Sequence, residues 1–261
     1  MFSFSQLNEV QILMFALILI RMSTFIISAA IFSTSNIPVH LKILTSVVFT
    51  IVVFQSVATN SALVRLSESQ GDLLMLAGRE VLVGIVLGFV TRLFFFAVSM
   101  AGEIVSVSTG LGQAQMFNPI MGSMSNAMEQ FYSIIATLIF LSMNGHHMMI
   151  TGLVESFTTT PIAQLSFGYA SFAEMVMKVQ SFLIIGIKIS APVLISMMII
   201  QFGMALLSRV VPQINVMVTS ASVTVLIGFI IMFISLPLLA MQISGVVDFS
   251  MNEFFKFLRT V

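Results

Sequence analysis

Ionisable residues inside apolar stretches are the first candidates for chemistry. Glu80 follows Arg79 within one apolar run, and Lys188 lies within another. A charge in an apolar environment is costly, so such a residue either couples transport to ion movement or forms an ion pair that fixes helix packing. We assign Glu80 and Lys188, together with Glu103, to packing and register.

The adjacent histidines His146 and His147 are the next group that could do chemistry. Neighbouring residues on a helix point about 100° apart, so the two rings cannot readily share one metal ion without further ligands. The chain has no cysteine, and no acidic residue stands at ligand spacing from the pair. We therefore expect no metal, no cofactor and no catalytic residues, and we predict that the protein is not an enzyme.

Gly84 and Gly88 form a Gly-x-x-x-Gly pattern within an apolar run. Because neither position has a side chain, two helix backbones can approach closely there. The pattern is common by chance in apolar helices, so it predicts helix packing and nothing more specific.

The connector 101–130 is the most informative stretch of the sequence. Gly110, Gly112 and the Asn118-Pro119 step predict a bent segment that can change its conformation. Its polar residues are mostly uncharged, and several methionines, whose flexible side chains adapt to changing shapes, follow Pro119. Two interpretations remain open. The segment either seals an opening and yields when that opening widens, or it is an ordinary surface loop.

The composition is that of an integral membrane protein. Of the 261 residues, 58% are hydrophobic and only 8% are charged, whereas a soluble domain has roughly 25% charged residues. The formal net charge is zero, so the chain lacks the basic surface that a nucleic-acid-binding protein needs. Several stretches reach the roughly 20 apolar residues that a helix needs to cross the hydrocarbon core, and we expect all of them to be helical. They are Val10–Phe32, Val39–Ala58, Leu73–Met100, Phe131–Val154, Val176–Leu207 and Ile214–Ile243.

Several short blocks of sequence follow one another along the chain. They are Arg21 with Pro38; Ala101-Gly102-Glu103 with Gly110-Leu111 and Pro119; Phe140-Leu141-x-x-Asn144-Gly145-His146, followed by Leu153, Phe157 and Pro161; and Leu206-Leu207-x-Arg209-x-x-Pro212-Gln213. Each block is weak alone. Their order and spacing, which extend nearly from end to end of the chain, resemble those of the FliR family of flagellar export-gate proteins.

The resemblance implies an all-α membrane protein that is one subunit of a helical gate. Residues 1–173 would resemble a P-type subunit of that gate, and residues 174–261 a Q-type helical hairpin. The hairpin tip, formed here by Arg209, Pro212 and Gln213, would face the cytoplasmic entrance. The implied partners are the P-type and Q-type subunits FliP and FliQ, a switch protein of the FlhB type, and unfolded protein substrates.

The resemblance also makes residues 106–122 the plug loop that blocks the closed pore. The chain departs from the family near Gln113 and Met116, where members often carry phenylalanines, and we expect Phe117 to take over one of these roles. Ser106 and Ser108 stand where members often carry glycine and glutamine. The candidate plug residues are Ser106, Gly110, Gly112, Gln113, Met116, Phe117, Pro119 and Met121.

The function implied by the resemblance is that of a structural and gating subunit of the flagellar type III protein export channel, in the flagellar basal body at the bacterial inner membrane. No GxxxxGK[ST] phosphate-binding loop is present, so the energy for transport must come from elsewhere. The alternative is a small-solute secondary transporter that uses Glu80 or Lys188 as a coupling site. Such transporters usually contain internal repeats, and this sequence shows none.

Overall fold

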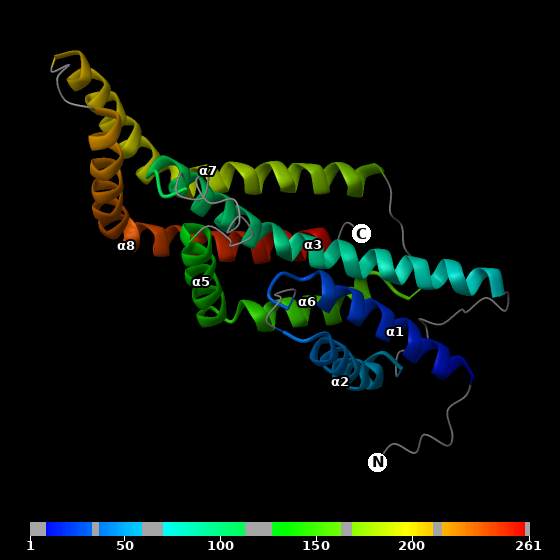
Figure 1. Cartoon of the computed structure of the whole chain (residues 1–261). Helices are drawn as coiled ribbons and strands as arrows, with labels where there is room; N and C mark the ends of the chain where they lie inside the picture. The colour runs from blue at the N-terminus through cyan, green and yellow to red at the C-terminus, as the bar shows by residue number, and fades with distance from the viewer. Residues whose placement is uncertain are drawn as a thin grey trace. The chain divides into compact units, whose positions relative to one another are not determined.

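Helices account for all the regular secondary structure in the described part of the protein (Figure 1). The computed structural model describes residues 9–32, 37–58, 70–112, 127–162, 169–210 and 216–258. Its helices are α1 (Glu9–Ser28), α2 (Val39–Ala58), α3 (Gln70–Ser108), α5 (Ala127–Ser142), α6 (Gly145–Thr159), α7 (Tyr169–Val210) and α8 (Val216–Leu258). The predicted all-α fold class is confirmed.

The predicted apolar stretches lie largely in helices, but several boundaries differ from expectation; α1 ends at Ser28, α7 begins at Tyr169 and α8 continues to Leu258. Helix α3 continues through Ala101–Ser108, which we had assigned to the connector, because nothing there breaks a helix before Gly110. The stretch Phe131–Val154 is divided into α5 and α6. Asn144, at the division, has a left-handed backbone with φ 58°, a conformation that ends a helix and that asparagine adopts more readily than most residues.

The long apolar helices are suited to a membrane. Helices α1, α3, α7 and α8 are each long and apolar enough to cross a bilayer. Taken together as one broken span, α5 and α6 are also long and apolar enough. Helix α2 has a shorter apolar stretch, Val39–Gln55. Helices α3, α7 and α8 have 39, 42 and 43 residues. At 1.5 Å per residue each is roughly 60 Å long, about twice the thickness of the hydrocarbon core. Part of each must therefore lie outside the bilayer.

The described residues belong to two compact units. Unit 1 comprises Met1–Leu93, Gly145–Lys178 and Ser250–Val261, and unit 2 comprises Phe94–Asn144 and Val179–Phe249. Each unit thus combines segments that are far apart in the sequence. Helices α3, α7 and α8 each contribute residues to both units.

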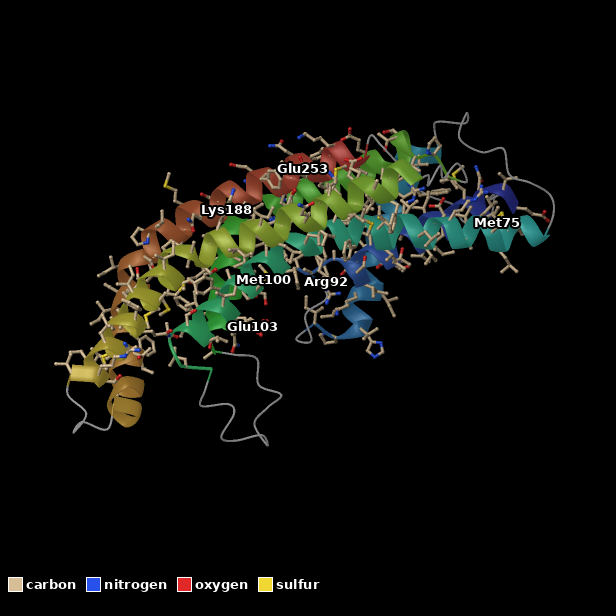
Figure 2. All side chains as sticks on the ribbon, turned by 90° about the horizontal axis from the view of Figure 1, so that it is seen from above. Met75, Arg92, Met100, Glu103, Lys188 and Glu253 are labelled. Atoms are coloured by element: carbon tan, nitrogen blue, oxygen red, sulfur yellow. The ribbon has the colours of Figure 1, made fainter. Side chains whose placement is uncertain are left out.

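Within unit 2, the C-terminal half of α7 and the N-terminal half of α8 lie side by side as a helical hairpin (Figures 1 and 2). This is the segment that we expect to resemble a Q-type subunit. A hairpin alone does not distinguish one kind of subunit from another, so the division of the chain near residue 174 stays a prediction.

Helices α1 and α3 approach closely in unit 1 at two glycines. A Cβ atom added at Gly84 would overlap the Thr24 hydroxyl and lie 2.7 Å from the backbone oxygen of Arg21. A Cβ atom added at Gly88 would overlap the Ser28 hydroxyl, which donates a hydrogen bond to the backbone oxygen of Gly84 at 3.2 Å. The absence of side chains at both glycines is what allows this contact between the two backbones.

Glycines also bring helices together in unit 2. A Cβ atom added at Gly186 in α7 would overlap the Met100 side chain and lie 2.8 Å from the backbone oxygen of Ala97 in α3. A Cβ atom added at Gly102 in α3 would lie 2.8 Å from the Cα atom of Glu129 in α5. Unit 2 is therefore packed around α3, with α5 and α7 both in close backbone contact with it.

We predict that Gly84→Ala destabilises the protein, whereas Gly78→Ala does not. The added methyl group at position 84 meets backbone and should lower the free energy of unfolding by about 1–3 kcal/mol. Gly78 has open space around it, so alanine there should be neutral or slightly stabilising because it favours helix. Thermal unfolding of both variants in detergent tests this, and equal effects would contradict the close α1–α3 contact.

Candidate functional site

Arg21 and Glu80 form a fully buried ion pair in unit 1. Arg21 lies on α1 and donates a hydrogen bond from its Nε to the Oε2 of Glu80 on α3, at 2.6 Å. The two side chains are only 0% and 1% exposed. Arg79, the neighbour of Glu80 in the sequence, points elsewhere and places its Nη2 3.7 Å from the sulfur of Met75. The partner of Glu80 thus comes from a different helix.

The same arginine also closes the C-terminal end of α6. Its Nη1 donates to the backbone oxygens of Ser156 and Thr160 at 3.1 and 3.0 Å, and its guanidinium carbon lies 4.4 Å from the centre of the Phe157 ring. Carbonyls at a helix C-terminus lack helical partners and carry partial negative charge, so a cation is favoured there. Arg21 therefore joins α1, α3 and α6 at a single point.

Lys178 is the centre of a second ion cluster in unit 1. Its Nζ lies 2.6 Å from a Glu253 oxygen on α8 and 3.1 Å from a Glu174 oxygen on α7 itself, and Lys256 approaches the other Glu253 oxygen at 2.8 Å. Residues four apart on a helix, as Glu174 and Lys178 are, often pair on the helix surface, but here the Lys178 side chain is only 4% exposed. The long-range partner Glu253 could not be read from local spacing.

The end of α3 is a glycine turn that leads toward the candidate plug. Gly110 has a left-handed backbone with φ 80°, a conformation that costs glycine little. Its N–H donates to the backbone oxygen of Val107 at 3.2 Å, and the N–H of Gly112 donates to that of Ser106 at the same distance. These bonds satisfy carbonyls that the helix end leaves free, as in a glycine C-cap. Ser106 itself is fully buried.

The hairpin of α7 and α8 holds this turn in place within unit 2. The side-chain amide of Gln201 on α7 donates to the backbone oxygen of Ser108 at 3.1 Å. On α8, a Cβ atom added at Gly228 would lie 2.8 Å from the methyl group of Thr109, so the backbone of α8 packs directly against the turn. The chain therefore leaves α3 from a fixed position.

The start of α5 is held in a similar way. The Ser99 hydroxyl on α3 donates to the Glu129 carboxylate in the first turn of α5, at 2.5 Å. A carboxylate at this position is also favoured by the free N–H groups of the helix N-terminus. Together with the Gly102 contact to α5, this bond fixes the beginning of α5 on α3. The segment 113–126 thus starts and ends at anchored points of unit 2.

Several predicted site residues lie outside the described residues, or stand apart from any cluster. Glu103 on α3 and Lys188 on α7 are exposed (Figure 2), and so is Arg209 in the last turn of α7. The structure thus brings Glu80 together with Arg21 but brings neither Glu103 nor Lys188 to an ion pair within the described chain. The predicted residues outside the described part are Gln113, Met116, Phe117, Pro119, Met121, Pro212 and Gln213.

The two histidines lie against each other at the start of α6. Their ring centres are 4.1 Å apart, and His147 is exposed while the Nδ1 of His146 is buried without a hydrogen-bond partner in the described structure. Across the described ranges, no three His, Cys, Asp or Glu side chains come together as metal ligands. This stacked pair can pack and donate hydrogen bonds, but it does not form a metal centre by itself.

We predict that Glu80→Ala strongly destabilises unit 1. Removing one partner of a buried pair leaves an uncompensated charge, which typically costs about 3–5 kcal/mol. The double variant Arg21→Met with Glu80→Leu should recover most of that loss, because no buried charge remains. Lys256→Ala is the control, since its ion pair is exposed and should matter little.

Unfolding midpoints in detergent and the amount of each variant in the membrane measure these effects. A Glu80→Ala protein as stable as the Lys256→Ala protein would show that the buried pair contributes nothing to the packing of α1, α3 and α6.

The family model described as "Bacterial export proteins, family 1" matches residues 12–249. The chain is 35% identical over 185 residues to the flagellar biosynthetic protein FliR of Aquifex aeolicus, covering 71% of this chain and 70% of that one. It is 27% identical over 250 residues to the protein of the same name from Bacillus subtilis, covering 95% of both chains.

A third relative with the same name is also similar over most of its length. The flagellar biosynthetic protein FliR of Escherichia coli is 28% identical over 222 residues, which cover 85% of this chain and 84% of that one. The family model extends from α1 into α8 and includes segments of both units and the Arg21–Glu80 pair, but it ends before Glu253. The chain therefore belongs to the FliR family of bacterial export proteins.

Proposed function

We propose that this chain is a structural and gating subunit of the flagellar type III protein export channel, where it helps to form the closed pore through which unfolded flagellar proteins are secreted. The observation that carries the proposal is the anchoring of both ends of the segment 113–126 within unit 2. Family membership and the apolar helices already make the chain a bacterial inner-membrane protein and a component of the flagellar export apparatus. We propose in addition that its segment 113–126 closes the pore.

A plug must stay attached at both ends while its middle moves. On one side, the Gly110 turn is held by Gln201 and packs against Gly228. On the other side, Glu129 holds the start of α5 through its bond with Ser99. Two fixed ends limit how far the intervening segment can travel, so the segment can leave a pore without being lost from it.

The sequence between these anchors suits a seal. It contains Met116, Phe117 and Met121 but no charged residue. Apolar side chains exclude water and ions from a narrow opening, and flexible methionines can adapt as an unfolded chain passes. We assign the seal to these three residues.

Long exposed apolar surfaces on the helices support an assembly with other subunits. Large hydrophobic side chains are exposed along much of α7 and α8, and these helices are too long for the bilayer alone to cover them. We propose that the P-type and Q-type subunits FliP and FliQ cover these surfaces, and that the tip at Arg209 lies near a switch protein of the FlhB type. No catalytic role is assigned.

The alternative of a secondary transporter is not favoured by the site. A coupling residue must change its partner or its protonation during transport. Glu80 is held by Arg21 in a buried pair, and Lys188 is exposed on another helix. Glu80 thus has a fixed, buried partner, which does not suit a residue that must change its partner during transport.

Deletion of residues 113–122, with the Ser106–Gly112 cap left intact, should make the inner membrane leaky to ions. The assembled channel would then lack its seal. Cells that express the variant together with the other export subunits should depolarise, as measured with a voltage-sensitive dye. Deletion of an equal number of residues from the polar connector 59–69 is the control, and it should leave the membrane tight.

Co-purification of the variant with the other subunits shows whether the channel has assembled. If the assembled channel without residues 113–122 keeps the membrane tight, the proposed plug is wrong.

A smaller leak is expected from loosening the anchor. Gly228→Val should push α8 away from the α3 turn and release one end of the plug, whereas Gly203→Val should not, because nothing lies within 4 Å of a Cβ atom at Gly203. The same dye measurement compares the two variants at equal expression. A leak of the same size in both would show that the contact at Thr109 does not hold the plug.

A further inference from the structure

Helix α2 in unit 1 has two faces of opposite character. At 100° per residue, five of its exposed residues lie within about 50° of one direction around the helix axis. We define the α2 outer face as these five residues, which are all large and aliphatic: Leu41, Leu44, Val48, Ile51 and Val52. The face therefore contains no ionisable, polar or aromatic side chain.

The inner face of α2 packs on α1 (Figure 1). The ring of Phe54 meets that of Phe15 on α1 edge to face, with the ring centres 5.7 Å apart. Ser46 and Thr50 also lie on this buried side, and each hydroxyl donates to the backbone oxygen four residues earlier at 2.7 Å. Helix α2 thus turns small polar residues inward and large apolar residues outward, which is the reverse of a helix that faces water.

A helix of another protein does not suit the outer face. Helices in membranes associate through small residues, chiefly Gly, Ala, Ser and Thr, because these let two backbones approach closely. The contacts within this chain follow the rule: Gly84 and Gly88 lie between α3 and α1, and Gly186 lies between α7 and α3. None of the five outer positions of α2 carries a small residue, so the face offers no close approach to another subunit or to a second copy of this chain.

The length of α2 suits lipid. Its apolar stretch Val39–Gln55 is roughly 26 Å long at 1.5 Å per residue, which fits within a hydrocarbon core of roughly 30 Å. Helices α7 and α8 are too long for the bilayer alone to cover them. Polar side chains, His40 and Gln55, are exposed at the two ends of the α2 stretch. Lipid chains can therefore cover the middle of α2 while its ends reach toward the headgroups.

We infer that the α2 outer face is a lipid-binding surface, and that phospholipid acyl chains still cover it when the export complex is assembled. Fluid chains adapt to any apolar shape, so such a face needs bulk and apolarity but no small residues. Helix α2 then lies at the lipid boundary of the complex, while other subunits cover α7 and α8. This contact needs neither the plug nor any particular partner subunit, so it extends beyond the proposed function.

Single cysteines that carry a nitroxide spin label locate the lipid, because the chain has no cysteine of its own. The assembled complex is reconstituted in phospholipid vesicles. A label at Val48→Cys should collide severalfold more often with oxygen, which concentrates in lipid, than a label at Val53→Cys, whose parent side chain is 5% exposed. A water-soluble nickel reagent should miss Val48→Cys but reach His40→Cys. The same complex with the parent chain gives the background from cysteines of other subunits.

Two results of this experiment overturn the inference. A label at Val48→Cys that neither oxygen nor nickel reaches shows that a protein subunit covers the face. A label that nickel reaches as readily as it reaches His40→Cys shows that the face lies in water.

A label on α7 separates this inference from the proposed function. Ile195 is exposed on α7, and a label at Ile195→Cys should lose its oxygen collisions when the complex assembles, because other subunits cover it. If this label stays in lipid and the Val48→Cys label does too, the proposed covering of α7 is wrong and the lipid contact of α2 stands.

Tolerance of a larger side chain gives a second test. Val48→Phe should assemble within about twofold of the parent protein, because lipid chains make room for the added ring. The matched control is Val53→Phe, the same change on the buried inner face, which should lose about tenfold because a packed site cannot expand. The readout is the fraction of membrane-inserted chain that stays in the large assembly after extraction in mild detergent. Loss of assembly by a Val48→Phe chain that unfolds like the parent protein when purified alone overturns the inference.

Discussion

The burial of Arg21 constrains the arrangement of unit 1. A guanidinium group has five N–H donors in a fixed plane and cannot lose its charge, so burying it requires a counter-charge and several acceptors; of the donor nitrogens of Arg21, only Nη2 has no acceptor in the described structure. Glu80 supplies the compensating charge from α3, and the last carbonyls of α6 supply further acceptors. Three helices must therefore meet at one point, and α6 must end at that point. If α1 shifted by one turn, the arginine would lose all of these partners at once.

The ion pair and the glycine pattern belong to the same contact. Glu80, Gly84 and Gly88 are four residues apart and so lie along one face of α3, which is the face that contacts α1. The glycines bring the backbones together, and the ion pair selects the register at which they do so. This combination matters for helices in a membrane. Apolar helix surfaces resemble lipid chains, so apolar contacts alone do not favour one register between two helices over another.

The sequence predicted the helices well and the sites only in part. Length and hydropathy locate apolar helices reliably, so the apolar stretches were found, and the sequence blocks predicted membership of the FliR family, which the comparisons confirmed. The break at Asn144 was missed because the stretch is apolar on both sides, although the Asn144-Gly145 pair is a turn signal.

Partners distant in the sequence could not be predicted from local spacing. Glu80 was noticed beside Arg79, yet its partner is 59 residues away on α1. The available signal was that Arg21 is the only ionisable residue of the stretch Val10–Phe32 and Glu80 is the only acid of Leu73–Met100, which suggests that they meet. Glu253 gave a weaker signal, because it lies among polar residues near the end of α8. The candidate plug residues from Gln113 to Met121 lie outside the described part, so their role rests on the sequence and on the anchors beside them.

The composition of unit 1 also has a consequence for biosynthesis. Its segments come from the beginning, the middle and the far end of the chain; Gly152 packs against Phe254, and Lys178 pairs with Glu253 as well as with its neighbour Glu174. A ribosome delivers these pieces in order, so the unit cannot close until residues beyond 250 have emerged. Until then the membrane insertion machinery, or a neighbouring subunit, must accommodate an incomplete helix bundle. In that bundle Lys178 lacks Glu253, the counter-ion that lies nearest to it in the folded unit.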